Sequence, residues 1–189
     1  MRQAEGLGFV WDDFDLTDGV VHVRTQLSRK KRGQEARRVL LKSARRRLGA
    51  RERDIDISAY PEFIALRKRH KAEQFATGFA GAGDFVSCTS DGKPLYYRNA
   101  LRDLGKAAND AGLSDGGEPE LSTHDLRHTS ISRWIAAGLD EAQVARMAGD
   151  TIEVIHSTYA HEFEQARRRD ETNAKLAAGT SIKLGEEAA

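Results

Sequence analysis

The spacing of hydrophobic residues changes from a two-residue period to a helical period at about residue 58. Before that point, Val20–Leu27 alternates and is rich in β-branched residues, and it follows the turn signal Asp18-Gly19, which predicts a strand. Arg38–Leu41 and Asp54–Ile57 are two further short strand candidates. Together they predict a small three-stranded antiparallel sheet, which is stable only where helices cover one of its faces.

The later part of the chain has helical periodicity with clear start and stop signals. Ser122 or Thr123 can cap a helix that Gly138 ends, and Asp140 with Gln143 forms a capping-box-like start. The predicted helices span 61–75, 97–111, 123–137, 141–148, 151–159 and 162–178, with a short apolar strand at 85–88 and the end of a helix at 1–8. The predicted fold class is α+β and mainly helical.

Size and composition indicate one globular domain. The chain has 189 residues, of which 39% are hydrophobic and 31% charged. We expect this domain over residues 1–178, followed by a disordered tail at 179–189. The sequence lacks both a run of about 18 apolar residues and a signal-peptide pattern. The single cysteine, Cys88, excludes an internal disulfide and a cysteine-based zinc cluster. These features predict a cytoplasmic protein without a membrane partner.

The net charge of +1 conceals a strong asymmetry. From Arg29 to Arg53 there are twelve basic residues and two acidic ones, a net of +10, whereas the rest has 18 basic and 27 acidic residues, a net of −9. A solvated loop is the plainer interpretation, but this density favours contact with phosphates. The DNA-binding residues expected on this basic arm are Lys30, Lys31, Arg45, Arg46, Arg47 and Arg51.

A candidate phosphate site lies in the predicted helix 123–137. His124 and Arg127 are three residues apart, so both project from one helix face. An imidazole and a guanidinium on one face can bind two oxygens of a single phosphate, and the imidazole can also move a proton. His-x-x-Arg is a weak signal alone. Downstream, the segment Ala148-Gly149-Asp150 is followed after nine residues by Tyr159.

The order HDLRHT, AGD and TYAH resembles the C-terminal signature of the tyrosine recombinase (phage integrase) family. In that family the pattern is His-x-x-Arg, then Leu-Gly-His, then a nucleophilic tyrosine. The start of the chain is similar to the family's first-arginine box, with Arg2 as the catalytic arginine and Glu5 as its acidic neighbour. Lys42 best matches the family's β-hairpin lysine, and Lys30 and Lys31 are the fallbacks.

The resemblance implies a DNA breaking–rejoining catalytic domain, incomplete at its N-terminus. Tyr159 would attack a scissile phosphate and form a 3′-phosphotyrosyl intermediate, while Arg2 and Arg127 neutralise the phosphate oxygens. His124 would assist, and Lys42 would protonate the leaving oxygen. The implied partner is double-stranded DNA, bound by a homo-oligomer that is a tetramer in the family. Neither a metal nor another cofactor is implied.

Several positions have competing interpretations. Asp150 stands where the family has histidine, and we expect it to cap the helix of Tyr159 rather than to contact phosphate. Tyr159 taken alone could be a core tyrosine. His128 is expected to be structural, and His161 matches a common family position of open role. The alternatives to an active recombinase are a non-catalytic DNA-binding remnant and a type IB topoisomerase-like activity.

Overall fold

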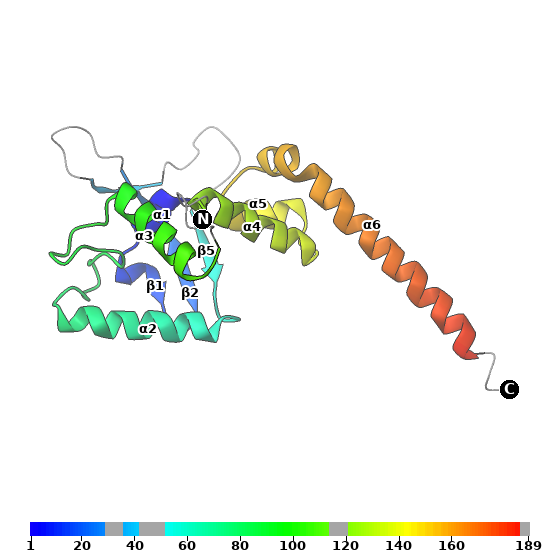
Figure 1. Cartoon of the computed structure of the whole chain (residues 1–189), viewed down its shortest axis with the longest axis horizontal. Coiled ribbons are helices and arrows are strands. Elements are labelled where there is room, and N and C mark those ends of the chain that lie inside the picture. Colours follow the sequence, from blue (N-terminus) through cyan, green and yellow to red (C-terminus); the bar gives the residue numbers. More distant parts are fainter. Residues whose placement is uncertain (29–35, 42–51, 114–120, 186–189) are drawn as a thin grey trace.

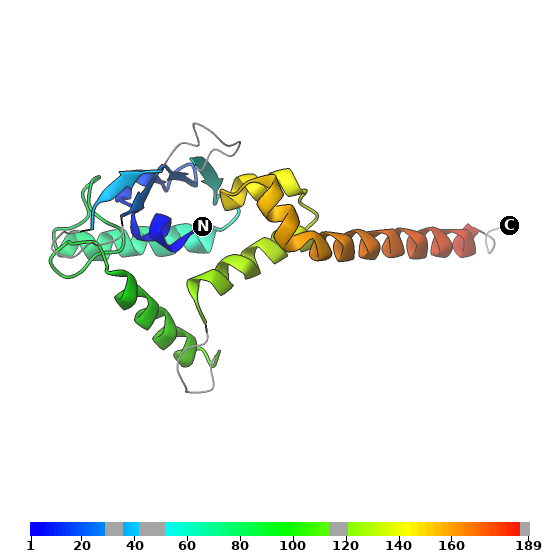
Figure 2. The same ribbon diagram turned by 90° about the horizontal axis from the view of Figure 1, so that it is seen from above.

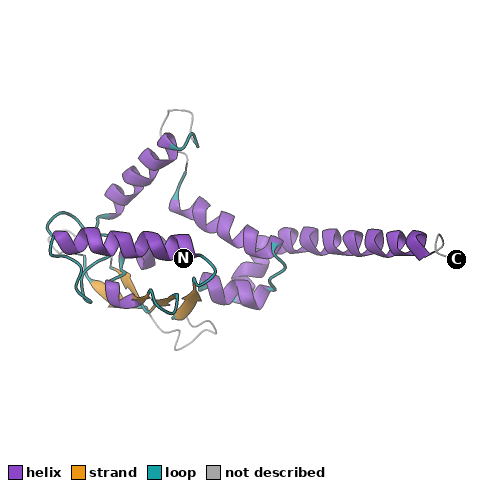
Figure 3. Cartoon of the chain, turned by 90° about the horizontal axis from the view of Figure 1, so that it is seen from below, coloured by secondary structure: helices purple, strands orange, loops and turns teal. Residues whose placement is uncertain are grey.

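The computed structural model describes residues 1–28, 36–41, 52–113 and 121–178, and the backbone of 179–185. Its helices and strands occur in the order α1 (Gln3–Leu7), the 3-10 turn η1 (Trp11–Asp13), β1 (Phe14–Asp15), β2 (Val20–Val23), β3 (Thr25–Leu27), β4 (Arg38–Leu40), β5 (Arg53–Asp56), α2 (Pro61–Ala76), α3 (Tyr97–Asp110), α4 (Thr123–Ala136), α5 (Glu141–Ala148) and α6 (Ile152–Gly185). The mainly helical α+β class predicted from the sequence is confirmed (Figure 3).

The strands form two small antiparallel sheets, in the orders β1-β2-β5 and β3-β4. The single predicted strand Val20–Leu27 is therefore wrong at Arg24, where the chain changes its partner from β5 to β4. The side chain of Arg24 donates to the carbonyl of Arg53 at 2.9 Å and to Asp54 at 2.6 Å. The backbone carbonyl of Arg24 accepts from the N–H of Leu41 at 3.0 Å. The predicted sheet of 20–27, 38–41 and 54–57 is thus divided between two sheets.

The first core lies between the sheets and α2, which runs alongside the strands (Figure 1). Its buried members are Phe9, Trp11, Val21, Val23, Leu41, Ile57 and Val86. Helix α2 adds Ile64 to this core, and its Gln74 side chain accepts from the indole N–H of Trp11 at 2.7 Å. The strand predicted at 85–88 is wrong, because this segment makes two isolated bridges, Val10 to Phe85 and Cys88 to Pro94.

The second core joins α4, α5 and the first half of α6. Its buried members are Ile131, Ile135, Val144, Ala145, Ala148, Ile155 and Tyr159. The predicted caps are confirmed: Ser122 accepts from the N–H of Asp125, and Asp140 accepts from the N–H of Gln143 at 2.7 Å. These caps and the buried faces fix the three helices relative to one another, and so fix Tyr159 relative to α4.

Helix α6 is continuous from Ile152 to Gly185, so the predicted interruption between 159 and 162 is wrong. Residues 167–178 are all exposed, and this part of the helix projects away from the body (Figures 1 and 2). The backbone remains helical beyond the predicted end at 178. Within the described residues, no helix is both long enough and apolar enough to span a membrane.

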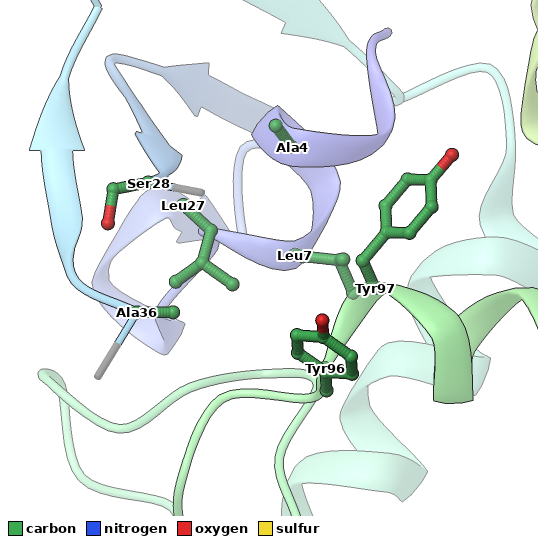
Figure 4. Close-up of a pocket in the computed structure, with 7 residues that line it drawn as sticks. All are labelled: Ala4, Leu7, Leu27, Ser28, Ala36, Tyr96 and Tyr97. Atoms are coloured by element: carbon green, nitrogen blue, oxygen red, sulfur yellow. The ribbon is translucent and has the colours of Figure 1, made fainter. Parts of the chain in front are cut away.

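An apolar pocket of about 450 Å³ lies between α1, β3 and the start of α3 (Figure 4). It is lined by Ala4, Leu7, Leu27, Ser28, Ala36, Tyr96 and Tyr97. None of the residues that the sequence marks as catalytic lines it. The candidate chemistry therefore lies elsewhere, where α1, α4 and the α5–α6 turn meet.

Two isoleucines of α6 provide a matched test of the second core. Ile155 is fully buried and Ile152 is 47% exposed, one turn away. We expect Ile155→Ala to lower the free energy of unfolding by about 2–5 kcal/mol, because it leaves a cavity between three helices. Ile152→Ala should change it by no more than about 0.5 kcal/mol. Urea denaturation followed by circular dichroism measures both, and equal losses would contradict the packing of α6 on α4 and α5.

Candidate active site

Arg2 and Glu5 reach the site through the short helix α1. Gly8 ends this helix against β3, where a Cβ atom would lie 2.7 Å from the backbone nitrogen of Leu27, so only glycine permits the approach. The N–H of Arg2 donates to Glu5 Oε2 at 2.9 Å, which closes the first turn. The helix is thereby held against the strand with Arg2 at its outer end.

Glu5 and Arg53 form an ion pair that is almost fully enclosed. Arg53 Nη2 lies 3.0 Å from Glu5 Oε2, and the two side chains are 3% and 0% exposed. Burial by itself would raise the pKa of Glu5, but the hydrogen bonds from Arg53 and from the N–H of Arg2 outweigh it and leave the pKa lowered. Arg53 Nε also donates to the carbonyl of Met147 at 2.9 Å. Arg53 therefore links β5, α1 and α5, and it does not belong to a phosphate-binding arm.

Gly149 ends α5 directly against the Arg53 side chain. Its φ of +71° is in the left-handed region, and a Cβ atom would collide with Arg53 Nη1. The carbonyl of Gly149 accepts from Arg2 Nη1 at 2.9 Å. The turn after α5 is thus fixed between two arginines, which determines where the next residue, Asp150, projects.

Asp150 binds the two arginines that the sequence marks as catalytic. Its Oδ1 accepts from Arg2 Nη2, and its Oδ2 accepts from Arg127 Nη2. The prediction that Asp150 caps the helix of Tyr159 is wrong, because the hydroxyl of Thr151 accepts from the N–H of Val154 at 3.3 Å and fills that role. The geometric reason is that α6 begins one residue later than a cap at Asp150 requires.

Arg127 retains hydrogen-bonding capacity beside Asp150. Its side chain is 9% exposed, and its Nη1 is buried without a hydrogen-bond partner among the described residues. A buried donor of this kind favours an anionic ligand. A cleft of about 530 Å³ adjoins Arg2 and Arg127, with Thr123, Leu126 and Trp134 also in its lining.

The core interpretation of Tyr159 is confirmed, and its role as the nucleophile stays a prediction. Its ring is 5% exposed and packs in the second core, while its hydroxyl is hydrogen-bonded to His128 Nδ1. Burial raises the pKa of Tyr159, and the neighbouring charge of Arg127 only partly opposes this. His124, on the same face of α4, has its ring centroid 6.1 Å from that of His128. The site therefore contains a second histidine that the sequence interpretation left as structural.

The remaining predicted residues divide into two groups. His161 is exposed and is hydrogen-bonded to the side chain of Gln165 at 2.8 Å. Lys42 and the arm residues Lys30, Lys31, Arg45, Arg46, Arg47 and Arg51 lie outside the described part of the chain. Among the described residues there is no cluster of three histidine, cysteine or acidic side chains able to hold a metal ion.

Residues 1–166 match the model of the phage integrase family. The search of curated proteins found no match. The Tn1549 transposon integrase in complex with circular intermediate DNA is similar in structure, with a TM-score of 0.64 and 21% identity over 92% of this chain and 56% of that one.

Two further solved structures are similar. The same integrase with transposon right-end DNA gives a TM-score of 0.66 at 21% identity, over 92% of this chain and 54% of that one. XerA recombinase has a TM-score of 0.59 and 16% sequence identity, over 92% of this chain and 53% of that one. The chain therefore spans about half the length of these solved chains.

The helical body with a small antiparallel sheet is the fold of an integrase catalytic domain. Since the family model covers most of the sequence, the chain belongs to the phage integrase family.

Because Glu5 and Arg53 form a buried ion pair, we expect the free energy of unfolding to depend on pH. Glu5→Gln should lower the free energy of unfolding at neutral pH by about 3–5 kcal/mol, because it leaves Arg53 buried without a counter-charge. The pKa of Glu5 is lowered in the fold, so its stabilisation is fully present above the ordinary value of 4.5 and is lost as the pH falls through the folded-state value. The difference in the free energy of unfolding between wild type and Glu5→Gln should therefore become smaller at acidic pH.

The measurement is urea denaturation at several pH values. Glu73→Gln is the control, since Glu73 is 66% exposed beside Arg69 and should matter little at any pH. A constant gap between wild type and Glu5→Gln across the acidic range would contradict the charge-based origin of the effect.

Proposed function

We propose that the chain is the catalytic part of a site-specific DNA recombinase that cuts and rejoins strands through a 3′-phosphotyrosyl intermediate at Tyr159. The proposal rests mainly on one observation: Arg2 and Arg127 both bind the carboxylate of Asp150. Arg127 and Asp150 are also close enough to Tyr159 to act on the pKa of its hydroxyl. Two guanidinium groups directed at one carboxylate can equally hold the non-bridging oxygens of one phosphate. The buried free donor of Arg127 supports the same ligand.

In this proposal the protein acts mainly by charge and position. Arg2 and Arg127 stabilise the negative charge that grows on the phosphate as Tyr159 attacks. His124 assists by hydrogen bond, and Lys42 protonates the leaving 5′ oxygen. The covalent intermediate keeps the energy of the broken bond, so a second strand can be joined without a nucleotide cofactor. The partner is double-stranded DNA, which we expect to be bound by several copies of the protein.

A second candidate function is favoured by one contact. Asp150 already occupies both arginines, and its charge opposes the binding of a phosphate. A non-catalytic DNA-binding protein would tolerate this arrangement, whereas an enzyme must let the phosphate displace or share that carboxylate. The two candidates differ in whether a covalent bond to DNA forms.

The covalent bond can be detected directly. Nicked duplexes drawn from the DNA flanking the gene trap the intermediate, because the short cleaved strand diffuses away. We expect an SDS-resistant protein–DNA adduct with the unmodified chain and with Tyr60→Phe, whose tyrosine is 60% exposed, and none with Tyr159→Phe. An adduct that persists in Tyr159→Phe would place the nucleophile elsewhere. DNA binding without an adduct in the unmodified chain would establish the non-catalytic candidate.

The charge of Asp150 should weaken DNA binding. We expect Asp150→Asn to bind duplex DNA about fivefold more tightly at low salt, because it removes a carboxylate that competes with phosphate, an effect on the order of 1 kcal/mol. Asp140→Asn makes the same change of charge at the cap of α5, where asparagine caps equally well, and should leave affinity unchanged. Fluorescence anisotropy measures both, and equal affinities for the two variants would show that Asp150 does not compete with DNA.

A further inference from the structure

His128 is the hydrogen-bond partner of the Tyr159 hydroxyl within the described part of the chain. The two ring centroids are 5.6 Å apart, so the contact is between neighbouring side chains rather than through a third group. The histidine lies one residue after Arg127 on α4, and α4 packs against α6 in the second core. The contact therefore depends on the same packing that fixes Tyr159.

The direction of this hydrogen bond follows from burial. The ring of Tyr159 is buried and its raised pKa keeps the phenol protonated, so the hydroxyl proton needs an acceptor. Nδ1 of a neutral His128 that carries its proton on Nε2 provides one. The opposite tautomer would donate to the phenol oxygen and leave the phenolic proton without an acceptor among the described residues. The geometry thus favours a phenol that donates to His128.

We propose that His128 is the catalytic base that accepts the Tyr159 proton during DNA cleavage and returns it during rejoining. This inference rests on the proposed phosphotyrosyl function. It assigns a chemical role to a residue that the His-x-x-Arg pattern does not include, and it separates two histidines of one helix face. His124 then forms a hydrogen bond to the phosphate, and His128 accepts the proton of Tyr159.

Every bond that forms in cleavage or in rejoining is matched by a bond that breaks. In cleavage, the phenolic O–H bond breaks, the proton moves to Nδ1, and the phenol oxygen forms a bond to phosphorus. The bond from phosphorus to the 5′ oxygen breaks, and that oxygen takes its proton from a separate acid, for which Lys42 is the candidate. In rejoining, the 5′ hydroxyl attacks phosphorus, and the imidazolium of His128 returns its proton to the departing phenol oxygen.

Charged groups of α4 and α6 lie around the pair of His128 and Tyr159. Asp125 on α4 interacts favourably with the charge of His128, and Glu162 on α6 and Asp150 before it lie near Tyr159. Arg127 opposes a second positive charge but favours the phenolate. From α5, Glu141 is engaged by His156 at 2.9 Å. His128 is itself exposed, so its proton can exchange with water.

The test compares two substrates, an ordinary nicked duplex and one with sulfur in place of the bridging 5′ oxygen. A thiolate leaves without protonation, so sulfur removes the need for the leaving-group acid but not for the base. We expect His128→Asn to slow adduct formation on saturating DNA by about 10²-fold or more on both substrates, with unchanged affinity for DNA. His156→Asn, an exposed histidine of α6, is the control and should behave as wild type.

Each other outcome has a distinct meaning. A His128→Asn rate within about threefold of wild type overturns the inference alone, and rescue by sulfur would assign His128 to the leaving group instead. Absence of any adduct in the unmodified chain overturns the proposed function and the base role with it.

Imidazole ¹⁵N NMR of the free chain tests the contact without DNA. We expect an unprotonated Nδ1 whose resonance moves in Tyr159→Phe, and a protonated Nδ1 in the neutral ring would contradict the proposal.

Discussion

The carboxylate of Asp150 lies between the guanidinium groups of Arg2 and Arg127, and the remainder of the site is arranged around this shared contact. Two cations brought together in a partly buried place repel one another unless an anion lies between them. The anion is positioned by the turn after α5, and that turn is held by Arg53 beneath Gly149. The ion pair of Arg53 with Glu5 in turn holds α1, which carries Arg2.

In the proposed function, this arrangement places a carboxylate of the protein itself where the phosphate of the substrate would bind. A phosphodiester and a carboxylate both present two oxygens with a single negative charge, so each can bridge the same pair of guanidinium groups. A DNA phosphate bound as proposed would have one advantage over Asp150, because the buried Nη1 of Arg127 could donate to a ligand with a further oxygen. Under the proposed function, the relative affinities of these two anions for Arg2 and Arg127 would determine whether a phosphate can bind at the site.

The sequence alone predicted the helices well because their caps and their hydrophobic periodicity agree, as at Ser122 and Asp140. It also predicted that His124 and Arg127 share one helix face, since they are three residues apart, whereas the catalytic roles assigned to the site residues stay predictions. What it missed depends on contacts between distant segments. The change of partner at Arg24 and the burial of Arg53 inside a basic stretch require tertiary structure. The place of His128 beside His124 could have been predicted, because it lies four residues later on the same helix face.

We propose that Asp150 holds the place of a substrate phosphate, and a structure of the chain bound to a nicked duplex tests this most directly. The account predicts a phosphate within hydrogen-bonding distance of both Arg2 and Arg127, Nη1 of Arg127 engaged, and Asp150 displaced from at least one arginine. A complex in which Asp150 still bridges both arginines while every phosphate lies elsewhere would contradict it.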